Sequence, residues 1–273
     1  MKGSSWNVAY SEPAHDLSDK AKDCLPLRSS GSGLTRHQRE IIWDTFRSHT
    51  ALRTWPEDVL NDLILAGQLQ SYNSGTLVYQ ENSHTPCVDI ILSGVLEWGW
   101  TNADGTRVVE EFLPPGEVIN LTSVFIDQCS IHDQRARGLT RLFHIPFETF
   151  RTQVNLAPNL LPSLVYMLAV RKRELHNRLR RTSLASFRAR LASRLLILAE
   201  RFGQPDQDGI VIRIRISQED LAALVMASRQ HTHKELRWFI EQGIIRIRYG
   251  RITVLKPEQL SAISKENEPH FVR

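Results

Sequence analysis

Residues 216–255 hold the feature that most constrains the fold, a stretch typical of two short capped helices followed by a hairpin: ISQEDLAALVMASRQHTHKELRWFIEQGIIRIRYGRITVL. Ser217 is a favourable N-cap, and Asp220 stands at the position that completes a capping box. Ser228 can cap the second helix, and Tyr249-Gly250 is a two-residue turn signal between two apolar runs. This order predicts a winged helix-turn-helix.

The second helix has an apolar face and a basic face. We expect Thr232, Leu236, Phe239 and Ile240 on the buried side. A helix in the DNA major groove presents its N-terminal residues to base edges. We predict base contacts from Arg229, Gln230, His233 and Lys234. Contacts with the DNA backbone, or support of the wing, are predicted for Ser217, Ser228, His231, Thr232, Arg237, Arg246, Arg248 and Arg251.

A basic helix exposed to solvent in some other small domain is the alternative interpretation of this face. The two caps, the short turn and the wing together favour DNA binding. The charge distribution agrees, because residues 171–251 contain 18 Lys and Arg against 8 Asp and Glu, while the whole chain has a formal charge of only +4. A basic C-terminal part behind an acidic N-terminal part is typical of a nucleic-acid-binding domain joined to another domain.

The 273 residues are enough for two ordinary domains. Residues 1–45 are rich in Ser, Gly and charged side chains, and we expect a flexible tail there, with no apolar segment of a secretory signal. Residues 46–157 contain short apolar runs separated by glycines, which predicts an antiparallel β-roll. No apolar run is long enough to cross a membrane, so we expect a cytoplasmic protein.

Residues 158–183 are predicted to form one long helix. Its apolar residues are spaced by four and three, close to a coiled-coil seam, and only Lys172 and Thr182 interrupt them. The helix could pack this stripe against its own roll, but a single seam helix between two domains favours a homodimer. The predicted seam consists of Leu161, Val165, Leu168, Leu175 and Leu179.

Residues 184–273 are expected to form the DNA-binding domain. A helix over residues 185–202 and a strand with alternating isoleucines over residues 210–216 should precede the helix-turn-helix. The whole chain is therefore assigned to the α+β class: an antiparallel β-roll, a long dimerisation helix and a winged helix-turn-helix.

This order of elements resembles the Crp–Fnr superfamily of bacterial transcription regulators. The most specific matches are RLASRLLILAERFG at 190–203, ISQEDLAALV, QGIIR and GRITVLKPEQL. SGVLEWG and LPPGE in the roll are similar to the jelly-roll effector domain of that family. The resemblance implies a dimeric regulator that is not an enzyme, that binds palindromic double-stranded DNA and that has RNA polymerase as a partner.

In that family an Arg and a Glu at the start of the recognition helix, and an Arg one turn later, read the half-site. They correspond to Arg229, Gln230 and Lys234 here. Gln can bond adenine bidentately, and Lys lacks the planar fork of Arg, so we expect an altered half-site. Met226 stands where the family has Gly in the turn. A positive φ would cost Met about 1 kcal/mol, so a differently built turn is expected.

The cyclic-nucleotide members of the family hold the phosphate with a Gly-Glu pair and an Arg. Asn120-Leu121 and Ser130-Ile131 occupy the corresponding positions, so the resemblance implies a roll that does not respond to cyclic AMP. Arg135 and Arg137 are close enough in sequence to replace the missing Arg. The small-molecule effector, if there is one, is not identified by these residues.

Metal, haem and iron–sulfur chemistry are not favoured. Cys24 stands alone near the N-terminus, and three cysteines cannot supply the four thiolates of a usual cluster. His84 and Cys87 could be offered as a pair of haem ligands, but a lone His and Cys on a roll loop are more often surface or packing residues. Either Cys87 or Cys129 could be a redox-sensing thiol. We expect no cofactor, no metal and no catalytic residue. The remaining alternatives are a cupin-like metal enzyme and an effector-binding roll that no longer reads DNA.

Overall fold

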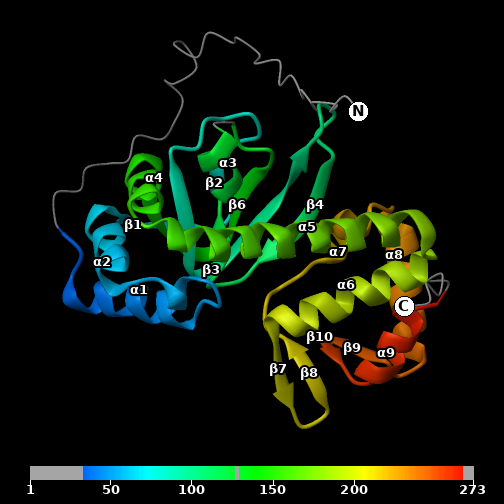
Figure 1. Ribbon diagram of the computed structural model, residues 1–273. Helices are drawn as coiled ribbons and strands as arrows, with labels where there is room; N and C mark the ends of the chain where they lie inside the picture. Colours follow the sequence, from blue (N-terminus) through cyan, green and yellow to red (C-terminus); the bar gives the residue numbers. More distant parts are fainter. Residues whose placement is uncertain (1–32, 127–128, 267–273) are drawn as a thin grey trace, which may run out of the picture.

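The computed structural model describes residues 33–126 and 129–266, and the predicted tail up to residue 32, with Cys24, lies outside them. The described chain forms an N-terminal roll and a C-terminal domain, with one long helix running across both (Figure 1). The tail was predicted to extend to residue 45, but helix α1 (Arg36–Ser48) begins nine residues earlier. Thr35 caps this helix, and its hydroxyl accepts from the Gln38 amide at 3.2 Å.

The roll is an antiparallel sheet built around two long strands, β3 (Cys87–Thr101) and β6 (Asp133–Pro146). The strand order is β1-β6-β3-β4, with β2 paired to β6 and β5 paired to β3. Gly94 is required where these long strands pass closely, because a Cβ there would lie 2.5 Å from the Leu139 carbonyl oxygen. The shorter strands are β1 (Gln68–Tyr72), β2 (Leu77–Tyr79), β4 (Arg107–Leu113) and β5 (Val118–Ile119). The predicted antiparallel roll is confirmed.

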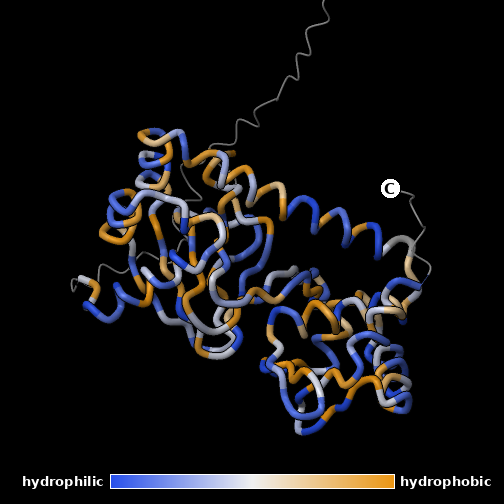
Figure 2. The backbone as a smooth tube through the Cα atoms, turned by 60° about the horizontal axis from the view of Figure 1, so that its bottom comes forward, coloured by the Kyte–Doolittle hydropathy of each residue, from blue (hydrophilic) through white to orange (hydrophobic). Residues whose placement is uncertain are grey.

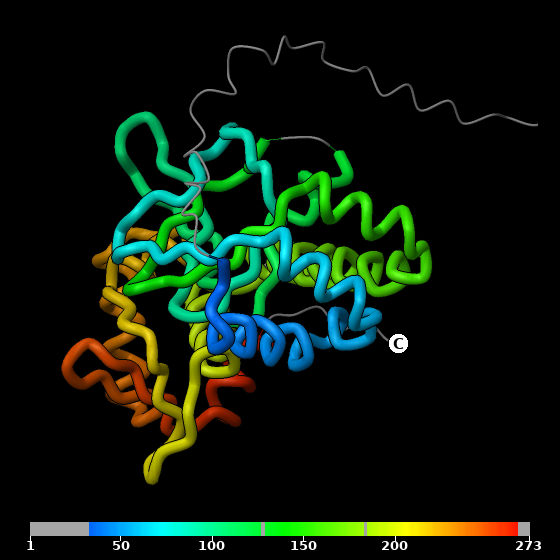
Figure 3. The backbone as a smooth tube through the Cα atoms, turned by 90° about the vertical axis from the view of Figure 1, so that its left-hand side faces the viewer, coloured from blue at the N-terminus to red at the C-terminus, as the bar shows by residue number. Residues whose placement is uncertain are grey.

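Short helices close one end of the roll. Helices α1, α2 (Glu57–Ala66) and α4 (Phe147–Leu156) bury their apolar residues against β3 and β6 in one continuous core. Figure 3 shows α1 and α2 side by side below the roll. The one-and-a-half-turn helix α3 (Leu121–Ile126) follows β5 and lies on the other side of the roll (Figure 1).

Helix α5 (Leu161–Leu184) runs from the roll to the C-terminal domain, and a 3-10 turn (Pro158–Leu160) precedes it. Figure 2 shows that it changes from apolar at its start to polar toward its end. Leu164 and Met167 pack on the roll. Four residues of the predicted seam are instead exposed by 42–63%, namely Leu161, Val165, Leu175 and Leu179, and Leu168 is partly buried. The helix therefore packs on its own roll with Leu164 and Met167 and leaves an apolar stripe, part of which (Leu168, Leu175 and Leu179) borders a cavity between α5 and the roll.

The C-terminal domain contains α6 (Phe187–Phe202), α7 (Gln218–Val225), α8 (Arg229–Glu241) and α9 (Pro257–Ser264) around a four-stranded sheet. Its strand order is β7-β8-β10-β9, and all pairs are antiparallel. The strand expected over residues 210–216 is shorter. It forms β8 (Gly209–Ile212), pairs with β7 (Gly203–Asp206), and leaves Ile214 and Ile216 to pack under the helices.

The roll and the C-terminal domain are in direct contact. Val95, Val109 and Phe112 of the roll belong to the same apolar cluster as the helix-turn-helix. Beside this cluster, Asp220 of α7 forms ion pairs with Arg107 and Arg137, and Glu97 pairs with the same two arginines at 3.4 and 3.3 Å. The first helix of the helix-turn-helix is therefore held on β4 by both packing and charge.

Candidate DNA-binding surface and effector cavity

The turn between α7 and α8 has the predicted caps and an unexpected backbone. The Ser217 hydroxyl accepts from the Asp220 amide at 3.0 Å, and the Asp220 carboxylate accepts from the Ser217 amide at 2.9 Å. Met226 has φ 51° and ψ 55°, in the left-handed region. The expectation of a differently built turn was therefore wrong, and Met adopts the conformation that favours glycine.

The start of α8 fixes which side chains can reach DNA. The Ser228 hydroxyl accepts from the His231 amide at 3.2 Å. Thr232, predicted to contact the DNA backbone, is fully buried, and its hydroxyl donates to the Ser228 carbonyl at 3.1 Å. That prediction is corrected, since Thr232 serves the core of the helix pair. Ile240 was predicted to lie on the buried side of α8, but its side chain is 42% exposed.

The predicted base-reading residues form one exposed surface on the first turns of α8. Arg229, Gln230 and Lys234 are all exposed, and the Arg229 guanidinium lies 3.7 Å from the Glu219 carboxylate. His233 is exposed with its Nδ1 3.1 Å from the Gln218 amide oxygen. His231 stacks on Phe187, their ring centroids being 4.1 Å apart. The hydrogen-bond donors of Arg229, Gln230 and Lys234 therefore lie at the protein surface, where DNA can reach them.

The wing follows directly from α8. Strands β9 (Ile245–Arg248) and β10 (Arg251–Val254) pair in register around Tyr249-Gly250, and both turn residues have positive φ. Tyr249 is 99% exposed at the tip, a position that charge-based reasoning did not select. Arg248 and Arg251 flank it and are exposed. Arg246 pairs with Asp208 at 2.9 Å, and Arg237 lies 3.7 Å from Glu241.

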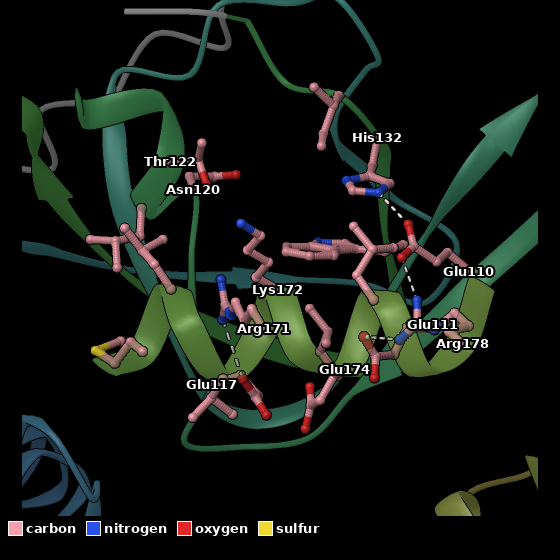
Figure 4. A pocket seen from close by; sticks show the side chains of 18 of the residues that line it. Glu110, Glu111, Glu117, Asn120, Thr122, His132, Arg171, Lys172, Glu174 and Arg178 are labelled. Atoms are coloured by element: carbon pink, nitrogen blue, oxygen red, sulfur yellow. Dashed lines mark hydrogen bonds and ion pairs between the residues drawn. The ribbon is translucent and has the colours of Figure 1, made fainter. Parts of the chain in front are cut away.

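A cavity of about 830 Å³ lies between the roll and α5. Trp98 and His132 stack in its wall with ring centroids 4.7 Å apart. Figure 4 shows His132 beside Glu110 in this wall. The His132 Nε2 lies 2.5 Å from the Glu110 carboxylate, which also pairs with Arg178. Burial would raise the pKa of Glu110, but the hydrogen bond and charge of His132, with Arg178, outweigh it and lower the pKa. Glu110 is therefore held ionised inside the cavity.

The residues that replace the cyclic-nucleotide cassette line the cavity but place no charged side chain there. Leu121 is buried, and the Asn120 amide donates to the Asp89 carboxylate at 2.6 Å. Ile131 is exposed at the cavity rim. Neither nearby arginine replaces the missing one: Arg135 donates to the Gly75 carbonyl at 3.0 Å, and Arg137 pairs with Asp220. Neither lines the cavity.

The cations that line this cavity come from α5 (Arg171, Lys172 and Arg178) and from α6 (Arg194 and Arg201). Arg171 pairs with Glu117 at 3.3 Å, and Lys172 points into the open space (Figure 4). In the described part of the chain Lys172 has no acidic partner within 4 Å. Lys172 faces the same cavity as its apolar seam neighbours Leu168, Leu175 and Leu179. The seam pattern showed that this position differs but not what it faces.

The histidines of the roll are far from forming a metal site. His144 contacts Asp89 at 2.6 Å and Tyr72 at 2.9 Å, whereas His132 belongs to the cavity wall. Within residues 33–126 and 129–266, no group of three His, Cys, Asp or Glu is arranged to hold a metal ion. Cys87 is fully buried. No helix of this part of the chain is long and apolar enough to cross a bilayer.

Two family models match this architecture. Residues 69–155 match the cyclic nucleotide-binding domain, and residues 189–263 match the Crp-like helix-turn-helix domain. The chain is 27% identical over 205 residues to the CRP-like cAMP-activated global transcriptional regulator of Mycobacterium tuberculosis, covering 72% of this chain and 89% of the relative. It is 24% identical to the global nitrogen regulator of Synechococcus elongatus, covering 71% and 88%.

Solved structures share the fold. FixK2 from Bradyrhizobium japonicum superposes with a TM-score of 0.65 at 18% identity, covering 73% of this chain and 98% of that one. A Crp/Fnr-family transcriptional regulator from Thermus thermophilus gives 0.62 at 21% identity, covering 74% and 100%. The roll, the long helix and the capped, winged helix-turn-helix agree with the matched domains, and the chain belongs to the Crp–Fnr superfamily of transcription regulators.

Proposed function

We propose that this transcription regulator acts as a homodimer that reads a palindromic DNA site. The observation that carries the proposal is the exposed surface at the start of α8, where Arg229, Gln230 and Lys234 lie together. The exposed apolar stripe of α5 supplies a surface for the second copy. Two recognition helices related by a two-fold axis would enter successive major grooves about 10 bp apart. The protein would act in the cytoplasm, beside RNA polymerase.

The half-site is proposed to differ from that of relatives with Arg, Glu and Arg at these positions. Arg229 would read a guanine, and Gln230 would bond an adenine through its amide. Lys234 would bond a guanine or a phosphate without the planar fork of arginine. Arg237, Arg248, Arg251 and the tip of the wing would lie against the DNA backbone. His231, Ser217 and Ser228 would add weaker backbone contacts.

The roll is proposed to bind an effector other than cyclic AMP. The Mycobacterium tuberculosis relative is named as cAMP-activated. In this chain Ser130-Ile131 stand where the cyclic-nucleotide members of the family have the phosphate-binding arginine, and Arg137, the nearest candidate in sequence, is bound to Asp220. A cyclic phosphate would therefore lack the bidentate partner that the family supplies at this position.

In vitro selection of random duplex DNA tests the reading of DNA. We expect the wild-type protein to enrich a palindrome with half-sites about 10 bp apart. Arg229→Ala should weaken binding by about tenfold or more and relax specificity at one position. Gln230→Ala should remove the preference for adenine. Arg213→Ala is the matched control, because Arg213 is exposed on the same domain but outside α8.

The same selection separates the alternatives. Cyclic AMP should change neither the enriched sequence nor its affinity. Enrichment of a half-site unaffected by Gln230→Ala would refute the proposed reading. No enrichment with the purified protein, or with cell extract added, would favour a roll that binds a ligand but has lost DNA recognition.

A further inference from the structure

A second cavity, of about 360 Å³, lies between α5 and α6. Helix α6 lines it with Arg190, Ser193, Arg194 and Ile197, whose spacing places them on one face. The end of α7, including Met226, closes it. It shares seven of its fifteen lining residues with the roll cavity, Arg194 and Met226 among them, but none of the aromatic wall formed by Trp98, Trp100 and His132. Arg190 lines the second cavity and not the roll cavity. We call it the hinge cavity, because it lies where the long helix meets the DNA-binding domain (Figure 1).

The lining of the hinge cavity is positively charged. Five arginines and three glutamates face it, which leaves a net charge of +2. Two of the arginines are balanced by carboxylates: Arg178 lies 3.0 Å from Glu111, and Arg201 lies 2.7 Å from the same side chain. Arg181 donates to the Ser193 hydroxyl at 2.7 Å. A hydroxyl does not neutralise the Arg181 guanidinium, so the excess charge is shared among the arginines of the lining and is not confined to one pair.

Arg190 and Arg194 lie one turn apart on α6, and within the described chain neither has a carboxylate within 4 Å. Arg194 is only 9% exposed. The Nε atom of Arg190 is buried without a hydrogen-bond partner, and its guanidinium lies 5.6 Å above the Phe187 ring. Burial, with the nearby charge of Arg178, lowers the pKa of Arg194 to about 10. Glu111 and Glu110 attract Arg194 only at longer range, so its buried guanidinium lacks a direct anionic partner, and Arg190 is partly buried beside it. Burying a cation in this way is costly, and an anion from outside the protein that bound between the two side chains would offset the cost.

We propose that the hinge cavity binds a small phosphorylated metabolite, with its phosphoryl group between Arg190 and Arg194. A phosphoryl group carries about two negative charges near pH 7, which matches the excess charge of the lining. Guanidinium forks bind phosphate bidentately. Ile197, Leu224 and Met226 give the cavity an apolar side for the body of the ligand. Its volume lies at the small end of ligand pockets, which start at roughly 300 Å³.

Thermal unfolding of the full-length protein tests this site, with phenyl phosphate as the probe. Phenyl phosphate combines a phosphoryl dianion with an apolar ring, and inorganic phosphate and benzoate separate these two parts. We expect a saturable rise in Tm of about 5 °C at a hundredfold excess over Kd. Arg190→Gln and Arg194→Gln should abolish the rise. Arg213→Gln, a control outside the cavity, should keep it.

Two further measurements distinguish phosphate binding from a structural role of the arginines and from binding in the roll cavity. Without ligand, Arg194→Gln should keep or raise the Tm, because it removes an unpaired buried charge, whereas a structural arginine would lower it. Lys172→Gln tests whether the probe enters the roll cavity instead, since Lys172 points into that space. Arg194 lines both cavities and Arg190 only the hinge cavity, so Arg190→Gln is the decisive variant. Loss of the response in Lys172→Gln, an unchanged response in Arg190→Gln, or no response in the wild type would each overturn the proposal.

The hinge-cavity proposal does not depend on the reading of DNA. The unfolding measurement contains no DNA, so a protein that enriches no palindrome can still show the phosphate response. Arg229 does not line the hinge cavity, so Arg229→Ala should retain this response in full.

Discussion

At the scale of single residues, Met226 carries a backbone cost that the sequence already suggested. Its left-handed conformation joins the two helices of the DNA-binding motif, and its side chain is 56% exposed. Met at this position was recognisable from the sequence as unusual. The prediction of a different turn considered only the energetic cost of a positive φ at Met226 and not the hydrogen bonds that hold it. The amide of Met226 donates to the carbonyls of Ala222 and Ala223, and these caps hold the conformation in place.

Met226→Gly should therefore stabilise the protein. Relief of the left-handed strain gains about 1 kcal/mol, and the added freedom of the unfolded chain reduces the net gain to about 0.5 kcal/mol. Urea unfolding would measure it. Ala227→Gly is the matched control, because Ala227 has no positive φ and should lose stability. A lower unfolding free energy for Met226→Gly would show that its side-chain contacts outweigh the strain.

Thr232 illustrates why site residues were harder to predict than caps. A cap depends on neighbours three residues away, and the Ser217 and Ser228 caps were predicted correctly. A contact with DNA depends on which side of a helix faces outward. For Thr232 the sequence led to two conflicting predictions, a buried position and a contact with the DNA backbone. Its 0% exposure resolves the conflict in favour of the apolar face.

At the scale of elements, α5 contributes both to an exposed apolar stripe and to the lining of the roll cavity. The seven-residue repeat of its apolar side chains does not distinguish these two surfaces. The pattern predicted the exposed stripe, but Leu175 and Leu179 also line the roll cavity. The strand at residues 210–216 shows the converse case. Four alternating isoleucines predict a longer strand than β8, because the same spacing also suits a loop that packs each second residue into the core.

Val165→Glu should weaken the homodimer. Val165 is exposed by 62% and does not line the roll cavity, so the change affects the seam alone. Losing a buried Val side chain from each subunit, at about 1.5 kcal/mol each, raises the dimer Kd by roughly 100-fold. Sedimentation over a range of concentrations would measure the shift.

Arg173→Glu is the control for this change, because Arg173 is exposed on the same helix outside the predicted seam. Its dimer Kd should stay within a fewfold of the wild type. If Val165→Glu assembled as tightly as the wild type, α5 would not be the dimer interface in solution.

At the scale of the whole molecule, the two domains are joined by contacts between residues far apart in sequence. Asp220 of α7 lies 113 residues from its partner Arg107, and no local pattern indicates such a pair. The two cavities could not be predicted from the sequence either, because each is lined by side chains from separate segments of the chain. Caps, turns and apolar periodicity are local, so they predicted the domains but not the surfaces between them.

Asp220→Asn should separate the domains and destabilise α7. Burial would raise the pKa of Asp220, but its hydrogen bonds with Ser217 and the charge of Arg137 lower it below the ordinary 3.8. A lowered carboxyl pKa contributes stability that is present above the ordinary value and lost as pH falls through the folded value. We expect a loss of about 2 kcal/mol at pH 7, less than for a fully buried pair because the arginines are partly exposed.

Urea unfolding of the Asp220→Asn variant and the wild type between pH 7 and pH 3 would measure this. The difference between them should shrink as the pH approaches 3. The pKa of Glu97 is raised by burial, despite the nearby arginines, so its own contribution changes with pH in the opposite sense. Asp208→Asn, at an exposed pair with Arg246, should change stability by less than about 0.5 kcal/mol. If the difference in unfolding free energy between the two proteins did not vary with pH, the charge of Asp220 would not contribute to stability.

Glu111 borders both cavities and is shared by Arg178 and Arg201. A ligand that binds Arg178 or Arg201 in one cavity weakens the ion pair of that arginine with Glu111. The charge around Glu111 in the other cavity then changes as well. Titrations with two compounds would then be thermodynamically linked, with each apparent affinity depending on the concentration of the other compound. A screen that offers compounds one at a time to the isolated protein would miss those that bind only as a pair.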